Sequence, residues 1–212
     1  MDIVYIGLKH LSNQEDAHTE ARSLLSFLAG DGEIRRGWQG RPYFTDRRGD
    51  FSVSHSGNAA CAAYSAARSA RTGALLRVGC DIEMIHPRKD RYPVARRFFR
   101  PAERRYLRDA PDPVARRLRF YSLWTLKECF LKAAGQSVFA MKSVPSFVSD
   151  SGELRGQAAS PALSVCAYLY ELEDPRKNRY ALAVAREVEG PAPCCPARLL
   201  YGPAFFPIFK GL

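Results

Sequence analysis

The sequence predicts an α+β fold. Residues 76–84 alternate between apolar and polar side chains, as a strand with one buried face does, whereas residues 113–134 carry apolar side chains at helical spacing. A chain of 212 residues can bury a sizeable core, as one large domain or as two small lobes. We expect His86-Pro87 to mark a hinge between two halves of the chain.

The first half of the sequence alternates between periodic segments and turn residues. A run with helical periodicity covers residues 14–28, and a glycine-rich connection follows at 29–48. Short alternating segments predict strands at 51–54, 61–65 and 76–84. The first half is therefore expected to provide one helix and three strands.

The second half contains a long helix with clear ends. Asp112 is placed as an N-cap, Pro113 takes the first helical position, and Gly135 follows the last turn, so a helix is expected over 113–134. Its apolar stripe is expected to begin at Val114. The other elements expected in this half are helices at 94–99 and 102–109 and strands at 163–172 and 179–185.

Two carboxylates stand two residues apart on the strand expected at 76–84. Asp81 and Glu83 project from the same face, because side chains alternate between the faces of a strand. Two oxygen ligands in this arrangement suit a hard divalent cation such as Mg²⁺. From this segment alone, a solvated polar face on an exposed strand is the simpler interpretation.

A third acid lies on the core-facing side of the long helix. Glu128 and Lys132 continue the apolar stripe of that helix, and a carboxylate so placed is costly unless it is paired, hydrogen-bonded or bound to a metal. Asp81 and Glu83 can be its partners only with a cation between the three acids. The alternative is a surface pair of Glu128 with Lys132, worth about 0.3 to 0.5 kcal/mol, which would also expose the neighbouring Trp124.

The segment that begins at residue 51 brings polar side chains to the end of a strand. Strict alternation would bury His55 beside Phe51 and Val53, so we expect the strand to end or bulge near Ser54 and to free the imidazole and the hydroxyl for an anion. A lone histidine is more often structural than functional. Upstream, Arg41 supplies a cation in a turn, and by itself this is a solvated surface arginine.

Together these segments resemble the 4'-phosphopantetheinyl transferase superfamily, in its longer, internally duplicated surfactin-synthetase-activating (Sfp-like) form. The G-[KR]-P turn is matched by Gly40-Arg41-Pro42, the S-H strand end by Ser54-His55, the (V/I)-G-x-D-x-E strand by residues 78–83, the R-F-F-x-x-x-E stretch by residues 97–103, and the W-[ST]-x-K-E-[AS]-x-x-K helix by residues 124–132. Two small departures are Thr125, where serine is commoner, and Cys129, in a small-residue position.

The resemblance implies transfer of the phosphopantetheine arm of coenzyme A to a serine hydroxyl of an acyl or peptidyl carrier protein, with release of adenosine 3',5'-bisphosphate. It implies Mg²⁺ or Mn²⁺ as the cofactor, held by Asp81, Glu83 and Glu128. Glu128 is also the candidate for activating the serine, with Lys132 as the second catalytic residue. Coenzyme A, the co-substrate, is expected to contact Arg22, Arg41, Ser54, His55, Lys127 and Lys132.

The same resemblance implies two similar α+β lobes that form a pseudo-dimer, with the coenzyme A site at their junction. We expect residues 1–86 to form the N-terminal lobe and residues 87–189 the C-terminal lobe. The proline-rich tail at 190–212 matches no family pattern. Because the pseudo-symmetry lies within one chain, a monomer is expected.

Positive charge is concentrated in one part of the chain. The formal net charge is +10, and residues 86–119 carry twelve Lys/Arg against four Asp/Glu, which accounts for +8 of it. A basic surface attracts coenzyme A, an acidic carrier protein or a nucleic acid. In the family, the carrier is typically acidic and docks just after the D-x-E strand, so the candidate docking residues are Arg104, Arg105, Arg116 and Arg117.

Two alternatives from other functional classes remain. A basic module that binds nucleic acid would use the same arginine-rich region, although no helix-turn-helix, zinc-finger or RNA-recognition signature supports it, and no nucleic-acid partner is expected. A metal-dependent phosphodiesterase would use the same three acids on water.

Cysteine usage and the first residues indicate a cytoplasmic protein. The six cysteines show no zinc-type spacing and are expected to be reduced thiols, with Cys194 and Cys195 the only pair expected to be reactive. Residues 1–10 include two charges and no long apolar run, so neither a signal peptide nor a membrane span is expected.

Overall fold

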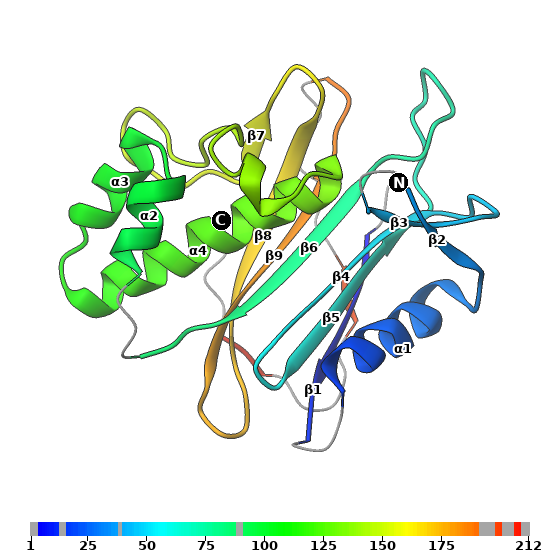
Figure 1. Cartoon of the computed structure of the whole chain (residues 1–212), viewed down its shortest axis with the longest axis horizontal. Helices are drawn as coiled ribbons and strands as arrows, with labels where there is room; N and C mark the ends of the chain where they lie inside the picture. The colour runs from blue at the N-terminus through cyan, green and yellow to red at the C-terminus, as the bar shows by residue number, and fades with distance from the viewer. Residues whose placement is uncertain are drawn as a thin grey trace.

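The computed structural model describes residues 4–12, 16–37, 40–87 and 91–190, together with the backbone of 198–200 and 206–208. These residues form two β-sheets, each with a helix packed on one face (Figure 1). The first sheet has the strand order β10-β1-β5-β4. Its strands are β1 (Tyr5–His10), β4 (Asp50–Ser56), β5 (Ala59–Ser65) and β10 (Arg198–Leu200).

The second sheet has the order β11-β8-β9-β6, with β7 paired to β8 at one end. Its strands are β6 (Val78–Met84), β7 (Gln157–Ala159), β8 (Ser164–Glu173), β9 (Arg179–Glu187) and β11 (Phe206–Ile208). A separate hairpin joins β2 (Ile34–Arg36) to β3 (Pro42–Phe44). Both large sheets thus receive an edge strand from the C-terminal part of the chain.

The helices lie on the outer faces of the two sheets. In the described residues they are α1 (Ala17–Ala29), α2 (Tyr92–Phe98), α3 (Pro101–Arg108), α4 (Pro113–Ala134) and the 3-10 turn η1 (Val138–Ala140). The helix α1 packs on β4 and β5, and α4 packs on β6 and β9. None of these described helices has the length and apolar character that a membrane span needs.

The two sheets share one topology. In the first, β1 is followed by α1 and then by the β4–β5 hairpin, and β1 pairs antiparallel with β5. In the second, β6 is followed by α4 and then by the β8–β9 hairpin, and β6 pairs antiparallel with β9. Each unit is therefore a strand, a helix and a hairpin, with the first strand paired to the last.

A hydrophobic core lies between the sheets, opposite their helices. Apolar side chains from β1, β5, β6, β8 and β9 form this cluster, which includes Ile6, Ala63, Val78, Ile82 and Leu182. Separate clusters fill the spaces beneath α1 and beneath α4. The alternation of residues 78–84 arises because the even-numbered side chains of β6 enter the shared core.

The sheets meet where the polar side of β4 lies against the unpaired edge of β6 (Figure 1). We call Asp50, Ser52, Ser54 and Ser56 the polar row. Each member contacts the backbone of the residue 28 positions later. Asp50 accepts a hydrogen bond from the N–H of Val78 (2.7 Å), and Ser52 donates one to the Cys80 carbonyl (3.4 Å). Ser54 accepts from the N–H of Ile82 (3.4 Å), and Ser56 accepts from the N–H of Met84 (3.0 Å). Side chains thus satisfy a strand edge that would otherwise be left open.

Helix α4 approaches β6 closely at Gly79. A Cβ atom at this position would overlap the Cys129 carbonyl oxygen and lie 3.0 Å from the Ala133 nitrogen. The Cys129 thiol donates a hydrogen bond to the Gly79 carbonyl at 3.0 Å. The glycine of the G-x-D-x-E pattern and the small residue after Glu128 are therefore both required by the contact between α4 and β6.

A buried ion pair ties α3 to α4. The Lys127 ammonium lies 3.1 and 3.2 Å from the two Glu103 carboxylate oxygens, and both side chains are fully buried. Burial lowers the pKa of Lys127, and Glu103 opposes this shift. Glu103 also accepts a hydrogen bond from the N–H of Arg100 at the start of α3. Glu103, the glutamate of the R-F-F-x-x-x-E stretch, is therefore a structural partner of Lys127.

Most elements lie where the sequence predicts them. The helix expected at 113–134 has those bounds, with Asp112 as its cap and Gly135 in the left-handed conformation. Its predicted stripe was wrong at its beginning, because Val114 is 54% exposed and continuous burial begins at Phe120, where α4 reaches the sheet. The strands β1, β2, β3, β7, β10 and β11 were not predicted.

The bulge expected near Ser54 is absent, since β4 pairs regularly with β5 from Asp50 to Ser56. The division expected after residue 86 would cut the second sheet, because β6 pairs with β9; a division between β5 and β6 keeps both sheets whole. Cys61, Cys80 and Cys129 are free thiols, as expected. Cys194 and Cys195 lie outside the described residues.

The packing at Gly79 predicts a stability defect. Replacing Gly79 by Ala should lower the free energy of unfolding by about 2 to 3 kcal/mol, because the added methyl group meets backbone atoms that cannot rotate away. Denaturant unfolding measures the change. The matched control is Gly37→Ala, whose new methyl group would meet only an ordinary contact at 3.6 Å and should change stability by less than about 0.5 kcal/mol. Equal stability of the two variants would contradict this account of the contact.

Candidate active site

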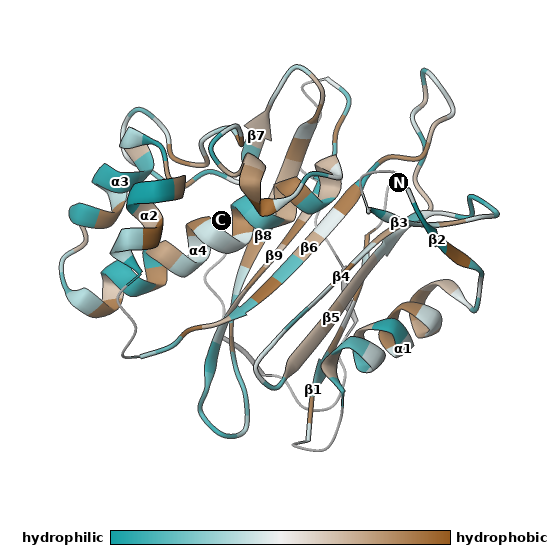
Figure 2. Cartoon of the chain, viewed as in Figure 1, coloured by the Kyte–Doolittle hydropathy of each residue, from teal (hydrophilic) through white to brown (hydrophobic). Residues whose placement is uncertain are grey.

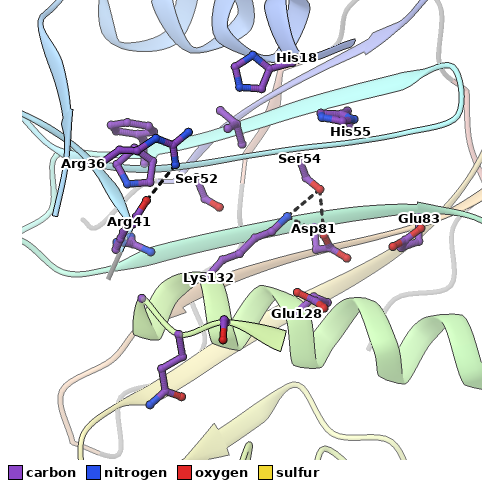
Figure 3. A pocket seen from close by; sticks show the side chains of 17 residues that line it. His18, Arg36, Arg41, Ser52, Ser54, His55, Asp81, Glu83, Glu128 and Lys132 are labelled. Atoms are coloured by element: carbon purple, nitrogen blue, oxygen red, sulfur yellow. Dashed lines mark hydrogen bonds and ion pairs between the residues drawn. The ribbon is translucent and has the colours of Figure 1, made fainter. Parts of the chain in front are cut away.

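A cavity of about 560 Å³ opens at the junction of the two sheets (Figure 3). Its walls come from α1, the β2–β3 hairpin, β4, β6 and the C-terminal part of α4. The site residues that line it are His18, Arg36, Arg41, Ser54, His55, Asp81, Glu83, Glu128 and Lys132. The cavity therefore collects most of the residues that the sequence singled out.

Asp81 is the centre of the polar contacts in this cavity. One of its oxygens, Oδ1, accepts hydrogen bonds from the Lys132 ammonium at 2.7 Å and from the Ser54 hydroxyl at 2.9 Å. Lys132 also donates to the Ser54 oxygen at 2.8 Å. Burial disfavours the charged form of Lys132, but Asp81 outweighs it and raises the pKa of this lysine. Lys132 is consequently held in the charged form beside Asp81.

These contacts define what Ser54 can do. A hydroxyl group has one proton, and Ser54 gives it to Asp81. Ser54 is 8% exposed although it lines the cavity. The geometry therefore favours a role in orienting Asp81 over direct donation to an anion.

Glu83 is held by the neighbouring sheet. The Ser56 hydroxyl on β4 donates to its Oε2 at 3.0 Å. Burial and the neighbouring Asp81 raise the pKa of Glu83 above its ordinary value, and Ser56, Lys132 and the nearby Trp124 side chain oppose the shift. The strand expected to carry Asp81 and Glu83 on one face does so, and α4 covers that face.

Glu128 faces Asp81 and Glu83 from α4 (Figure 3). Burial and the negative charge of Asp81 raise the pKa of Glu128 to about 7, and Lys132 opposes this shift. Three carboxylates thus share a partly buried region with one ammonium group. Their mutual repulsion would be relieved by a further cation.

The donor set suits a hard divalent cation. Asp81 Oδ2 is buried and has no hydrogen-bond partner among the described residues, and such an orphaned oxygen is a free ligand position. As the side chains stand, no group of three or more His, Cys, Asp or Glu in the described chain is spaced to hold a metal ion. Lys132 and Ser56 already occupy one oxygen each of Asp81 and Glu83. The chemistry of the site fits Mg²⁺ or Mn²⁺, while its spacing would have to adjust.

The other end of the cavity is basic. Arg41 pairs with Asp50 and donates to the Val78 carbonyl at 3.0 Å, which fixes its guanidinium at the wall between the sheets. Arg36 donates to the Gly40 carbonyl at 3.0 Å and also lines the cavity. An anionic ligand would thus lie with one end near the carboxylates and the other near these arginines.

His55 is exposed at the end of β4, where its ring lies 6.3 Å from that of His18 on α1. It shares a face of β4 with Phe51 and Val53, which pack beneath α1 and also line the cavity, and His55 is the exposed member of the three. The imidazole is therefore available as expected, although no bulge is needed to free it.

Two predicted coenzyme A contacts lie outside the cavity. The prediction for Lys127 was wrong, because one residue along a helix is a rotation of about 100°, which turns Lys127 away from the cavity and into the core beside Glu103. Arg22 is exposed on α1 and does not line the cavity, whereas His18, one turn earlier, does. His18 and Arg36 were not predicted as site residues. His18 could have been found from the sequence, because it lies four residues before Arg22 and therefore on the same face of the helix.

The candidate docking arginines lie on α3 and the first turns of α4. Figure 2 shows that α2 and α3 carry many hydrophilic residues. Arg105 and Arg116 are exposed, while Arg104 donates to the Phe99 carbonyl at 3.0 Å and Arg117 is half-buried. None of the four lines the cavity, so this surface is separate from it.

Comparison with known proteins identifies the same family that the sequence motifs resemble. Residues 77–185 match the family model described as the 4'-phosphopantetheinyl transferase superfamily. The chain is 30% identical over 152 residues to the 4'-phosphopantetheinyl transferase HetI of Nostoc sp., covering 68% of this chain and 60% of that protein. It is 32% identical over 148 residues to the 4'-phosphopantetheinyl transferase AcpT of Escherichia coli, covering 68% of this chain and 71% of that protein.

A third relative, a putative 4'-phosphopantetheinyl transferase of Synechocystis sp., is 35% identical over 105 residues, or 48% of this chain. The chain covers 39% of the length of this relative, so its similarity to the cyanobacterial proteins spans less than two thirds of each of them. The matched region includes β6, α4 and the three carboxylates. The chain belongs to the 4'-phosphopantetheinyl transferase superfamily.

Proposed function

We propose that this chain transfers the 4'-phosphopantetheine moiety of coenzyme A to a serine hydroxyl of an acyl or peptidyl carrier protein, releasing adenosine 3',5'-bisphosphate. The observation that carries the proposal is the convergence of Asp81, Glu83, Glu128 and Lys132 on one cavity with a basic far end. Relatives of this chain are named for the same transfer.

The ligand set of the proposed cofactor is Asp81, Glu83 and Glu128. The buried, unpartnered Oδ2 of Asp81 supports this assignment within the described residues. When bound, Mg²⁺ or Mn²⁺ neutralises negative charge on the pyrophosphate oxygens. Among the described residues, the Lys132 ammonium donates to Asp81 and Ser54, so the third of its three N–H groups can donate to a phosphate oxygen.

The remaining residues bind and orient coenzyme A. We assign His55 and Lys132 to the pyrophosphate, and Arg41 with Arg36 to the nucleotide end, since these cations line the same cavity. Ser54 maintains Asp81 and Lys132 in place. The proposed coenzyme A site thus lies at the junction of the two sheets, whose matching topology supports an internal duplication and a monomeric pseudo-dimer.

The proposed reaction is a substitution at phosphorus. The serine oxygen forms a bond to the phosphorus that carries the pantetheine arm, and the bond from this phosphorus to the anhydride oxygen breaks. Glu128 accepts the serine proton, directly or through one water, and adenosine 3',5'-bisphosphate departs with the electron pair of the broken bond.

Neither alternative from the sequence gains support. The family and the named relatives are transferases, and nothing in the described site favours hydrolysis by water over transfer to a hydroxyl. The arginine-rich surface needs no nucleic acid to explain it, because an acidic carrier protein is drawn to the same charge. We therefore expect neither a nucleic-acid nor a membrane partner.

The first functional prediction concerns the carboxylates. Asp81→Asn and Glu128→Gln should each lower transfer by at least about 100-fold without unfolding the chain, because each removes a ligand charge from a site of mutually repelling acids. The measurement is the intact mass of an apo carrier protein incubated with coenzyme A and Mg²⁺. Glu33→Gln, at an exposed glutamate outside the cavity, is the control. Near-normal turnover in either variant, or full activity in excess EDTA, would rule out the mechanism.

The second functional prediction concerns coenzyme A. Removing His55 or Lys132 should weaken its binding by roughly 10- to 150-fold, the effect of losing a charge-assisted contact of about 1.5 to 3 kcal/mol. Calorimetric titration of His55→Ala and Lys132→Ala measures this. Lys177→Ala serves as the control, since Lys177 is exposed and pairs with Glu173 away from the cavity. Unchanged affinity in both test variants would refute the assignment.

The third functional prediction separates carrier docking from chemistry. Arg105→Glu and Arg116→Glu should raise the KM for an acidic carrier and leave coenzyme A affinity unchanged, because both arginines are exposed and lie outside the cavity. Raising the salt concentration should also raise the KM of the wild type for the carrier, since exposed charges are screened beyond about 10 Å at 0.1 M. Arg71→Glu, an exposed arginine on the 66–77 loop, is the control. A wild-type KM in both docking variants would eliminate this surface as the docking site.

A further inference from the structure

Ser56 touches a predicted metal ligand but stays outside the cavity. Its hydroxyl donates to Glu83 Oε2 at 3.0 Å and accepts the N–H of Met84 at 3.0 Å. The Met84 N–H occupies a lone pair of the serine oxygen, so the serine proton is directed at Glu83. Ser56 does not line the cavity and therefore reaches a bound substrate only through Glu83.

Glu83 lies at the junction of the two sheets, where Ser56 reaches it from β4. The Trp124 side chain on α4 is a further neighbour that favours the charged form of Glu83. The Trp124 ring is itself held by stacking on Phe120, with ring centres 5.9 Å apart, and by an edge contact with Phe98 at 6.0 Å. The Ser56 hydroxyl, a neutral donor, thus holds this carboxylate without neutralising its charge.

We propose that Ser56 is a positioning residue that orients the Glu83 carboxylate toward Asp81 and Glu128. The inference rests on the proposed function, in which these three acids form the ligand set. Hydrogen-bond partners of a ligating carboxylate typically contribute 10- to 100-fold to metal affinity, because they hold the ligand in its binding orientation. Ser56 belongs to the strand of one sheet, and Glu83 to the strand of the other, so the contact also makes the ligand set depend on the junction.

The polar row offers a matched control for this role. Ser52 lies on the same strand and faces the same edge of β6, where its hydroxyl donates to the Cys80 carbonyl at 3.4 Å. Ser52 contacts the β6 backbone but no carboxylate among the described residues. Ser52 also lines the cavity, so Ser52→Ala removes a junction contact and a hydroxyl of the cavity wall, whereas Ser56→Ala removes a junction contact and the hydrogen bond to Glu83.

The test is a calorimetric titration of Mg²⁺ into the full chain, with the same coenzyme A concentration in both solutions. We expect Ser56→Ala to weaken Mg²⁺ binding about 10-fold or more, Ser56→Thr to stay within a few-fold of wild type because it keeps the hydroxyl, and Ser52→Ala to bind normally. Thermal unfolding without metal should show similar decreases in Tm for Ser56→Ala and Ser52→Ala. Ser56→Cys, similar in size and a weaker donor, replaces Ser56→Ala if that variant does not fold.

The outcomes separate this inference from the function on which it rests. If the wild type binds neither coenzyme A nor Mg²⁺, the proposed function fails. If the wild type binds both, the inference is overturned by normal Mg²⁺ affinity in Ser56→Ala. It is equally overturned by a loss in Ser52→Ala as large as that in Ser56→Ala, since the junction and not the carboxylate contact would then be responsible.

Discussion

The architecture depends on side-chain hydrogen bonds that replace a backbone ladder between β4 and β6. The polar row of β4 meets the edge of β6 at a constant offset of 28 residues. Because each strand is the last of its sheet along this edge, the row joins two sheets that share no strand pairing with each other in the described part of the chain. The polar row lets the sheets turn at their junction, so that both can enclose the same apolar cluster.

The same contacts create the conditions for chemistry. Ser54 and Ser56 each satisfy a backbone N–H of β6 and also bond the carboxylate of the preceding residue, Asp81 or Glu83. The junction therefore places acids in a partly buried region that is otherwise costly for negative charge. Lys132 offsets part of this cost, and Asp81 Oδ2, which has no hydrogen-bond partner among the described residues, can accept a further cation.

Helix α4 supplies the rest of the site because β6 admits it so closely. Gly79 and Cys129 bring the backbones together, and this approach carries Glu128 and Lys132 to the carboxylates of β6. On the opposite side of α4, the buried Lys127–Glu103 pair fixes α3. Adjacent residues of one helix thus perform different tasks, since Glu128 lines the cavity and Lys127 lies in the core.

The sequence by itself determined the features that depend on local periodicity and capping. Asp112, Pro113 and Gly135 set the bounds of α4, and alternation placed Asp81 and Glu83 on one face of β6. Only the tertiary structure decided which residues from distant parts of the chain contact each other. It placed Lys127 in the core and His18 and Arg36 at the cavity. It also set the register between the polar row and β6. The physical reason is that periodicity records which face of an element is buried, whereas the register between segments far apart in sequence arises only when they pack.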